Sequence, residues 1–149
     1  MLNYFIKSPE NKKEWEEYLL FRWEMLRKPL GMTQESLEDE LEDNSFHLTA
    51  VARKDNKIIG SGRIHFNSQE EVQIRYMAVS DDFKREGVGS LIVNKLEEYA
   101  VKNGAKTAIL NAREEAIGFY ISLGYLEGSP YRSDTGIPHK TMKKDLPCL

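Results

Sequence analysis

The chain has 149 residues, of which 40% are hydrophobic and 30% are charged, and its formal net charge at pH 7 is -3. This length and balance predict one globular domain over residues 1–149 and exclude an intrinsically disordered chain. The acidic excess argues against a nucleic-acid partner, because binding to a phosphate backbone depends on a clustered basic surface. A cationic amine fits this charge better as a substrate.

The cysteine content and the apolar runs predict where the protein works. Cys148 is the only cysteine, so no internal disulfide forms and the reducing cytoplasm is the expected location. No apolar run approaches the length of a membrane span, and residues 1–7 are too short for a signal peptide. We therefore expect a soluble cytoplasmic protein with no membrane partner.

Hydrophobic periodicity predicts helices and strands along the chain. In chain order, the expected elements are a helix over residues 11–26, a second, acidic helix that begins after Thr33, strands over 48–53, 57–66 and 72–79, a helix over 88–102, a strand over 107–110, a helix over 114–123, a strand from Tyr125 and a strand over 140–144. Gly104 and Gly124 suit the ends of two of these helices. This order predicts a mixed sheet with helices on both faces.

The segment that joins the strand over 72–79 to the helix over 88–102 has the features of an anion-binding loop. Backbone N–H groups at a helix N-terminus are unpaired and carry partial positive charge, so a pyrophosphate can bind there. Gly87 and Gly89 allow a close approach, and Lys84 and Arg85 add positive charge. Position 92 is Ile rather than a third glycine, and no Gly-Lys-Ser/Thr follows, so neither a dinucleotide fingerprint nor a triphosphatase loop fits.

This loop resembles the acetyl-CoA loop of the GNAT superfamily of N-acetyltransferases. The pattern of that loop is Arg or Gln, two variable residues, Gly, one variable residue, and then Gly or Ala. In this chain it reads Lys84-Arg85-Glu86-Gly87-Val88-Gly89. Lys84 departs from the pattern by replacing a planar side chain with a flexible point charge, and we expect this to weaken the affinity for CoA. An ordinary strand-to-helix turn is the alternative interpretation of the loop alone.

A second segment strengthens the resemblance. Residues 111–125 are similar to the GNAT segment in which Asn, Ala, Phe-Tyr and Gly-aromatic follow one another, here Asn111, Ala112, Phe119-Tyr120 and Gly124-Tyr125. Together the two motifs extend the resemblance over about residues 46–144. It implies an α/β fold of the α+β type, with a mixed, mostly antiparallel central sheet and helices on both faces.

The resemblance also implies a function and a set of site residues. The implied reaction transfers an acetyl group from acetyl-CoA to a primary amine of a small molecule or peptide, by direct attack in a ternary complex and without a metal. The implied cofactor-binding residues are Met77, Ala78, Val79, Lys84, Arg85, Glu86, Gly87, Val88, Gly89, Ser90, Asn111 and Phe119. The pantetheine arm would lie where the sheet opens between the strands that end at Val79 and Leu110, with a backbone N–H of residues 77–79 stabilising the oxyanion.

Tyr120 matches the GNAT tyrosine that donates a proton to the departing thiolate. Its alternative role is that of a core aromatic residue with its hydroxyl at the surface. Asn111 either binds the cofactor, opens the sheet or simply caps an element. Gly118 weakens a helix interior, and a close approach by the cofactor is a reason for its presence.

The general base and the acceptor site are less sharply indicated. His65, His139, Glu24 and a water held by Arg75 are the candidate bases. Glu24, Arg75 and His139 are the candidate substrate residues, and residues 136–139 look like a C-terminal segment of one GNAT subgroup. His47, His65 and His139 lack the spacing of metal ligands.

The acceptor class and the alternatives stay open. Six of the nine residues from Glu35 to Asp43 are acidic, which favours a polyamine, an aminoglycoside or a lysine-bearing peptide, although such a run is also typical of a solvated helix face. The alternative functions are a catalytically silent acyl-CoA sensor and a purely structural domain. A homodimer is compatible with the sequence.

Overall fold

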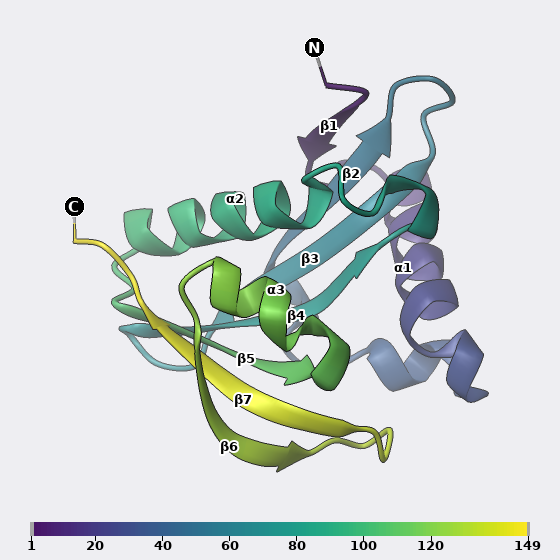
Figure 1. The fold of residues 1–149 in the computed structure, drawn as a ribbon. Coiled ribbons are helices and arrows are strands. Elements are labelled where there is room, and N and C mark those ends of the chain that lie inside the picture. The colour runs from purple at the N-terminus through teal and green to yellow at the C-terminus, as the bar shows by residue number, and fades with distance from the viewer. Residues whose placement is uncertain (1, 149) are drawn as a thin grey trace. The chain divides into compact units, whose positions relative to one another are not determined.

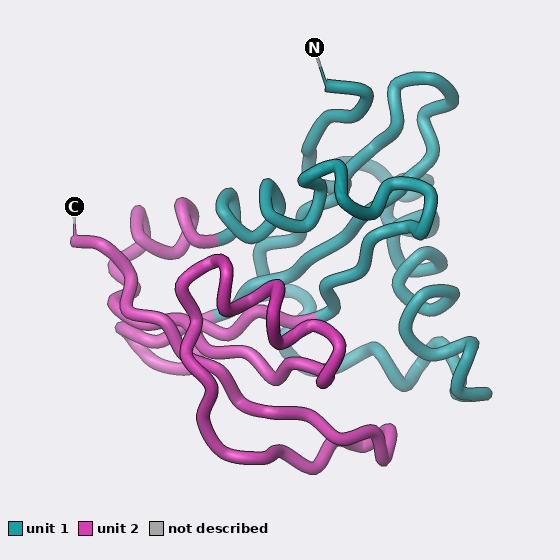
Figure 2. Tube along the Cα trace, viewed as in Figure 1, with its two compact units in different colours: residues 1–65, 76–96 teal, residues 66–75, 97–149 magenta. Residues whose placement is uncertain are grey.

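The computed structural model describes residues 2–148, which form two compact units (Figure 2). The first unit contains the chain up to His65 together with Tyr76–Leu96, and the second contains Phe66–Arg75 and the chain from Glu97 onward. Strand β4 and helix α2 each contribute residues to both units. The expectation of a single domain over residues 1–149 stays a prediction.

The described residues form seven strands, three α-helices and five short 3-10 helices (Figure 1). In chain order they are β1 (Tyr4–Lys7), α1 (Lys12–Leu26), η1 (Lys28–Leu30), η2 (Gln34–Leu37), η3 (Glu42–Asn44), β2 (Phe46–Ala52), β3 (Ile58–Phe66), β4 (Glu71–Val79), η4 (Asp81–Phe83), α2 (Val88–Lys102), β5 (Thr107–Arg113), η5 (Glu114–Ala116), α3 (Ile117–Ser122), β6 (Leu126–Arg132) and β7 (Pro138–Asp145), where η denotes a 3-10 helix. The strand order is β1-β2-β3-β4-β5-β7-β6. Strand β4 pairs in parallel with β5, whereas β1–β2, β2–β3, β5–β7 and β6–β7 are antiparallel, which confirms the mixed, mostly antiparallel sheet.

The first unit has helices on both faces of its strands. The register pairs His47 with Arg63 and Thr49 with Ser61, so these polar side chains share one face of β2 and β3. Helix α1 covers that face, where the Tyr18 hydroxyl lies 2.7 Å from His47 Nδ1. The opposite face carries Gly60, Gly62 and Ile64, and α2 packs against it through Val88 and Ile92.

The second unit is built on β5. Its neighbours are the first residues of β4 on one side, where Glu71 pairs with Thr107 and Gln73 with Ile109, and β7 on the other. The buried side chains of this unit include Leu110, Ala112, Tyr120, Tyr125 and Met142. Tyr120 of α3 packs edge-to-face on Tyr125, with ring centroids 5.8 Å apart. Helix α3 is thereby fixed against the buried part of the unit.

The acidic segment after Thr33 does not form the helix that its sequence predicts. It folds into the two short helices η2 and η3, which residues 38–41 separate, and Glu38 at the start of that linker is extended. Like charges three and four residues apart oppose an α-helix. In addition, the side chain of Asp39 turns back to accept a hydrogen bond from the Leu41 N–H, which satisfies the backbone outside a helix.

Two further boundaries differ from the prediction. The helix over 114–123 is a 3-10 turn, η5, followed by the shorter α3. Such turns are frequent at the N-termini of α-helices, and no side chain caps the start of either element here. Strand β5 continues past Leu110 to Arg113, since β7 pairs with it along its whole length. Within residues 2–148, no helix combines the length and apolarity needed to cross a bilayer.

Candidate cofactor-binding and catalytic site

The predicted cofactor loop runs from β4 through η4 to the N-terminus of α2. Arg85 and Gly87 both adopt left-handed backbone conformations, with φ values of 69° and 82°. Left-handed residues in such a turn aim successive N–H groups toward one point and create an anion-binding concavity. The hydrogen-bond ladder of α2 begins where Leu91 N–H donates to the Gly87 carbonyl at 3.0 Å, so the N–H groups of the first turn before it are available to a ligand.

The charged side chains of the loop are exposed to solvent. The Lys84 ammonium lies 2.9 Å from the Asp81 carboxylate, and both side chains are largely exposed. Ion pairs of this kind contribute little, so a phosphate can displace Asp81 from Lys84. The Tyr4 hydroxyl donates to the Glu86 carbonyl at 3.3 Å and ties the loop to β1. Burial, with a smaller contribution from the Glu86 charge, raises the pKa of Tyr4 and keeps this donor protonated.

Two glycines of β3 determine how closely α2 approaches the sheet. A Cβ atom on Gly60 would lie 2.8 Å from Val88 Cγ1, and one on Gly62 would lie 2.7 Å from Ile92 Cγ2 and 2.6 Å from Met77 Sδ. Neither glycine leaves room for a methyl group. Sequence reasoning missed this role, although the Gly-x-Gly spacing within a predicted strand places both residues on one face and signals a close neighbour.

Strand β4 is distorted immediately before Met77–Val79, the residues predicted to hold the pantetheine arm. Tyr76 has a φ of 58°, a left-handed conformation that costs a residue with a side chain about 1–2 kcal/mol. The Ser61 hydroxyl donates to the Tyr76 carbonyl at 3.0 Å. Such a residue interrupts the regular alternation of strand hydrogen bonds. Buried and half-buried residues nevertheless alternate along the whole of β4.

Tyr76 lies within a buried charged cluster that sequence reasoning also missed. We call Arg22, Arg63, Asp39 and Glu42 the Tyr76 clasp. Both guanidinium groups lie over the Tyr76 ring, with Cζ atoms 4.3 Å (Arg22) and 4.8 Å (Arg63) from its centroid. Both arginines are fully buried. A lone charged residue in an otherwise apolar stretch, such as Arg22 in α1, was the available signal.

Ion pairs neutralise the clasp. Arg22 pairs with Glu42 at 2.9 Å, and Arg63 pairs with Asp39 at 2.9 Å and with Glu42 at 2.6 Å. Burial opposes ionisation of Glu42, but the hydrogen bond and charge of Arg22, reinforced by Arg63, outweigh it and lower the Glu42 pKa. The clasp therefore holds two positive and two negative charges at neutral pH.

In the second unit, Tyr120 is positioned by aromatic contacts and not by a hydrogen bond. Its side chain is buried, and the Phe119 ring packs edge-to-face on it with centroids 4.9 Å apart. Among residues 2–148, none accepts a hydrogen bond from its hydroxyl. Burial raises the Tyr120 pKa well above its ordinary value, so the phenol keeps its proton at neutral pH.

Asn111 lies inside β5, opposite Thr141 of β7, and its Oδ1 atom accepts a hydrogen bond from the Thr141 hydroxyl at 2.7 Å. The capping role is therefore wrong, because the N-cap before η5 is Arg113. Gly118 is exposed, and a Cβ atom there would meet nothing within 4 Å. Within residues 2–148, no packing contact requires this glycine.

The candidate bases differ in how accessible they are. His65 is only 3% exposed within β3, so an acceptor amine does not reach its ring. His139 is half-buried, and its Nδ1–H donates to the Ile137 carbonyl at 2.7 Å, which leaves the Nε2 lone pair available. Glu24 is exposed on α1 in the first unit, and Arg75 is half-buried on β4 in the second.

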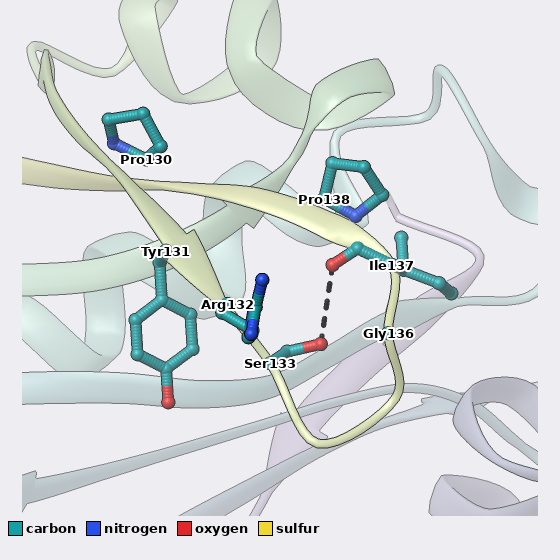
Figure 3. Close-up of a pocket in the computed structure, with 7 residues that line it drawn as sticks. All are labelled: Pro130, Tyr131, Arg132, Ser133, Gly136, Ile137 and Pro138. Atoms are coloured by element: carbon teal, nitrogen blue, oxygen red, sulfur yellow. Dashed lines mark hydrogen bonds between the residues drawn. The ribbon is translucent and has the colours of Figure 1, made fainter.

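The second unit also contains an open pocket at the turn between β6 and β7 (Figure 3). Its volume is about 330 Å³, and it is lined by Pro130, Tyr131, Arg132, Ser133, Gly136, Ile137 and Pro138. The Ser133 hydroxyl donates to the Ile137 carbonyl at 3.3 Å and stabilises the turn between β6 and β7. Three of the lining residues, 136–138, belong to the segment that ends with the candidate substrate residue His139.

The two units thus divide the predicted residues. The residues from Met77 to Ser90, together with Glu24, lie in the first, whereas Arg75, Asn111, Phe119, Tyr120 and His139 lie in the second. Within the described part of the chain, no group of three His, Cys, Asp or Glu side chains is arranged to hold a metal ion.

Known proteins are similar to this chain in sequence and in fold. The sequence model of the acetyltransferase (GNAT) domain matches residues 24–146. An uncharacterized N-acetyltransferase of Bacillus subtilis, YjcF, is 32% identical over 137 residues, which cover 91% of this chain and 96% of that protein. The structure of an aminoglycoside 6'-N-acetyltransferase complexed with coenzyme A has a TM-score of 0.79 at 16% identity, over 97% of this chain and 99% of that one. The ribosomal-protein-S18-alanine N-acetyltransferase of Escherichia coli has a TM-score of 0.75 at 18% identity, over 98% and 96%.

Proposed function

The chain belongs to the GNAT acetyltransferase family, and we propose that it transfers the acetyl group of acetyl-CoA to a primary amine of a small molecule or peptide. Membership makes the protein an acyl-CoA N-acetyltransferase. The observation that carries the finer proposal is the loop after β4, whose two left-handed residues precede the unpaired N–H groups of α2. That loop can bind a pyrophosphate group. Acetyl-CoA, the acetyl donor of the family, carries such a group.

In this proposal, the residues from Lys84 to Ser90 bind the pyrophosphate of acetyl-CoA. The N–H groups of the first turn of α2 carry most of the binding, because Lys84 offers a point charge without the planar fork of an arginine. The backbone of Met77–Val79 binds the pantetheine arm, and one of its N–H groups faces the thioester oxygen. Asn111 contributes the amide group that its bond to Thr141 leaves unused. Phe119 contributes an apolar surface.

The proposed chemistry is direct attack in a ternary complex. The amine nitrogen forms a bond to the thioester carbon, the C–S bond breaks, and the thiolate of CoA accepts a proton from the Tyr120 hydroxyl. Two observations support this role of Tyr120: its phenol is protonated at neutral pH, and no described residue engages its hydroxyl. A group that keeps its proton at neutral pH and has no other acceptor is suited to act as a general acid.

His139 is the base that we propose for the amine. Its Nδ1–H donates to a backbone carbonyl, so the neutral ring presents Nε2 as the acceptor. It is also the residue after Pro138, which lines the pocket at the turn between β6 and β7. Glu24 and Arg75 are proposed to contact the acceptor and not to move its proton.

Amine-dependent release of free CoA tests the function. We expect release from acetyl-CoA with at least one member of a panel that contains a polyamine, an aminoglycoside and a lysine-bearing peptide. Gly89→Asp places a carboxylate among the first-turn N–H groups and is expected to abolish release. Asn94→Asp, which adds the same charge at an exposed site on α2, serves as the matched control. Binding of acetyl-CoA without release for any amine would favour the silent sensor instead.

A further inference from the structure

We propose that Arg22 and Arg63 are positioning residues for the strand that binds acetyl-CoA, because they hold the Tyr76 ring and with it the left-handed backbone just before Met77–Val79. The inference rests on the proposed function, in which those backbone groups bind the pantetheine arm. All members of the Tyr76 clasp lie in the first unit together with Tyr76. The contacts that position Tyr76 in this proposal therefore lie within one unit.

The contacts of the two guanidinium groups favour stacking on the ring over complete hydrogen bonding. Their Cζ atoms lie 4.3 Å and 4.8 Å from the ring centroid. The Nε atoms of Arg22 and Arg63 are buried, and no described residue accepts a hydrogen bond from either. Leaving buried donors unpaired is unfavourable, so the hydrogen bonds to the carboxylates alone do not account for this arrangement. The Tyr76 ring adds cation–π attraction to both guanidinium groups, and this attraction is stronger away from water.

Stability alone does not account for the clasp. A buried ion pair contributes little net stability compared with apolar packing of similar volume, whereas it fixes the geometry of the groups that it joins. Here Glu42 accepts from both arginines, and Asp39 accepts from Arg63 through both oxygens at 2.9 Å. The two cations are therefore locked relative to each other and to the ring.

The clasp is itself anchored to the rigid part of the unit. The Tyr18 hydroxyl donates to His47 Nδ1 at 2.7 Å, and His47 Nε2–H donates to the Glu42 carbonyl at 2.8 Å. These two hydrogen bonds connect α1 and β2 to η3, the turn that contains Glu42. Because Ser61 holds the Tyr76 carbonyl from β3, the left-handed residue is fixed at both its side chain and its backbone.

A charge-balanced variant tests the proposal without leaving an unpaired buried charge. Arg63→Met/Asp39→Asn removes one guanidinium with its main partner and keeps Arg22 on Glu42. We expect faster hydrogen exchange at the amides of residues 77–79 in the free protein, by about tenfold or more. We also expect the KM for acetyl-CoA to rise about tenfold with kcat changed less than about threefold. The matched control is Glu70→Gln/Lys106→Met, which removes an exposed ion pair.

Two further measurements separate positioning from folding and from the proposed function. Tyr76→Phe retains the ring, and its amides at residues 77–79 are expected to exchange slowly. Tyr76→Leu removes the ring, and the same amides are expected to exchange faster. Unchanged exchange in Arg63→Met/Asp39→Asn would overturn the proposal. Exchange is measured without a ligand, so a native protein that binds no acetyl-CoA would refute the proposed function while the exchange result still decides whether the clasp positions the strand.

Discussion

At the scale of single residues, the sharpest expectation concerns Tyr120. Its hydroxyl is the proposed proton donor, and Tyr120→Phe removes the hydroxyl while keeping the ring that packs on Phe119 and Tyr125. We expect kcat to fall by about a hundredfold, as is typical when a general acid is removed. The dissociation constant for acetyl-CoA, measured by calorimetry, should stay nearly unchanged. An unaltered kcat would leave Tyr120 with only its packing role.

The buried His47 predicts how stability depends on pH. Burial, as the largest cause, lowers its pKa in the folded protein, so the fold favours the neutral ring that bonds Tyr18 and the Glu42 carbonyl. Below the ordinary His pKa of about 6.5, the unfolded chain takes up a proton that the folded chain resists. Its contribution to stability is therefore complete above this pH and is lost as the pH falls through the lowered value. The charges that face the ring are those of Glu42, Arg22 and Arg63.

The measurement is the melting temperature of the native protein and of His47→Gln at pH 7.5 and pH 5.5. Between the two pH values, the melting temperature of the native protein should fall further than that of the variant. The extra fall should be about 2–4 °C for each 1 kcal/mol that the neutral His47 ring contributes to the free energy of unfolding. Glutamine can donate and accept at the same sites without titrating, and both proteins retain His65 and His139. Equal losses in the two proteins would show that another group causes the acid sensitivity.

At the scale of elements, the sequence predicted α1 and α2 almost residue for residue, because each has helical spacing and clear stop signals. It failed where tertiary contacts override local preference. The acidic run after Thr33 reads as a helix, yet Asp39 and Glu42 face buried arginines, and this requires a chain that bends between η2 and η3. The local sequence of this run does not reveal that its partner, Arg63, lies far along the chain on β3.

The same reasoning explains what was found and missed at the site. The cofactor loop was predictable, because its glycines, its cations and the helix start are contiguous. The left-handed Tyr76 was not, since nothing in its neighbours requires a positive φ and its restraints come from α1, β3 and the acidic segment. The capping role of Asn111 was wrong because the length of β5 is set by its pairing with β7.

The contact between α2 and β3 leads to an expectation for Gly62. A methyl group there would lie 2.7 Å from Ile92 Cγ2 and 2.6 Å from Met77 Sδ, so Gly62→Ala forces α2 and β4 to move. We expect a loss of about 1–3 kcal/mol in the free energy of unfolding, as for overpacked cores. Because α2 carries the first-turn N–H groups and β4 carries Met77, we also expect weaker binding of acetyl-CoA. Denaturant titration and calorimetry measure the two effects.

The matched control for Gly62→Ala is Gly118→Ala. A methyl group at Gly118 meets nothing within 4 Å, and it removes the entropic cost of a helical glycine. Its free energy of unfolding should therefore stay the same or increase. If Gly62→Ala were equally well tolerated, the close approach of α2 to β3 would not be a constraint on the fold.

At the scale of the whole molecule, the acidic run of residues 35–43 presents fewer carboxylates to solvent than its sequence suggests. Asp39 and Glu42, which belong to the acidic run of residues 35–43, are paired with the buried Arg22 and Arg63. The exposed carboxylates of that run are those of Glu35, Glu38, Glu40 and Asp43. Attraction of a cationic acceptor therefore depends on this smaller set, and it should weaken as added salt screens them.

The binding of acetyl-CoA should stabilise the whole chain, since a ligand that binds only the folded state shifts the unfolding equilibrium. At a concentration of about 100 times the dissociation constant, the gain is about 2.7 kcal/mol, or about 5–10 °C in melting temperature for a chain of this length. Gly89→Asp should show no such shift, and Asn94→Asp should show the full one. At higher salt the shift should shrink, because Lys84 and Arg85 are exposed and contribute through screened charge. A shift that persists unchanged in Gly89→Asp would mean that acetyl-CoA binds elsewhere than at the N-terminus of α2.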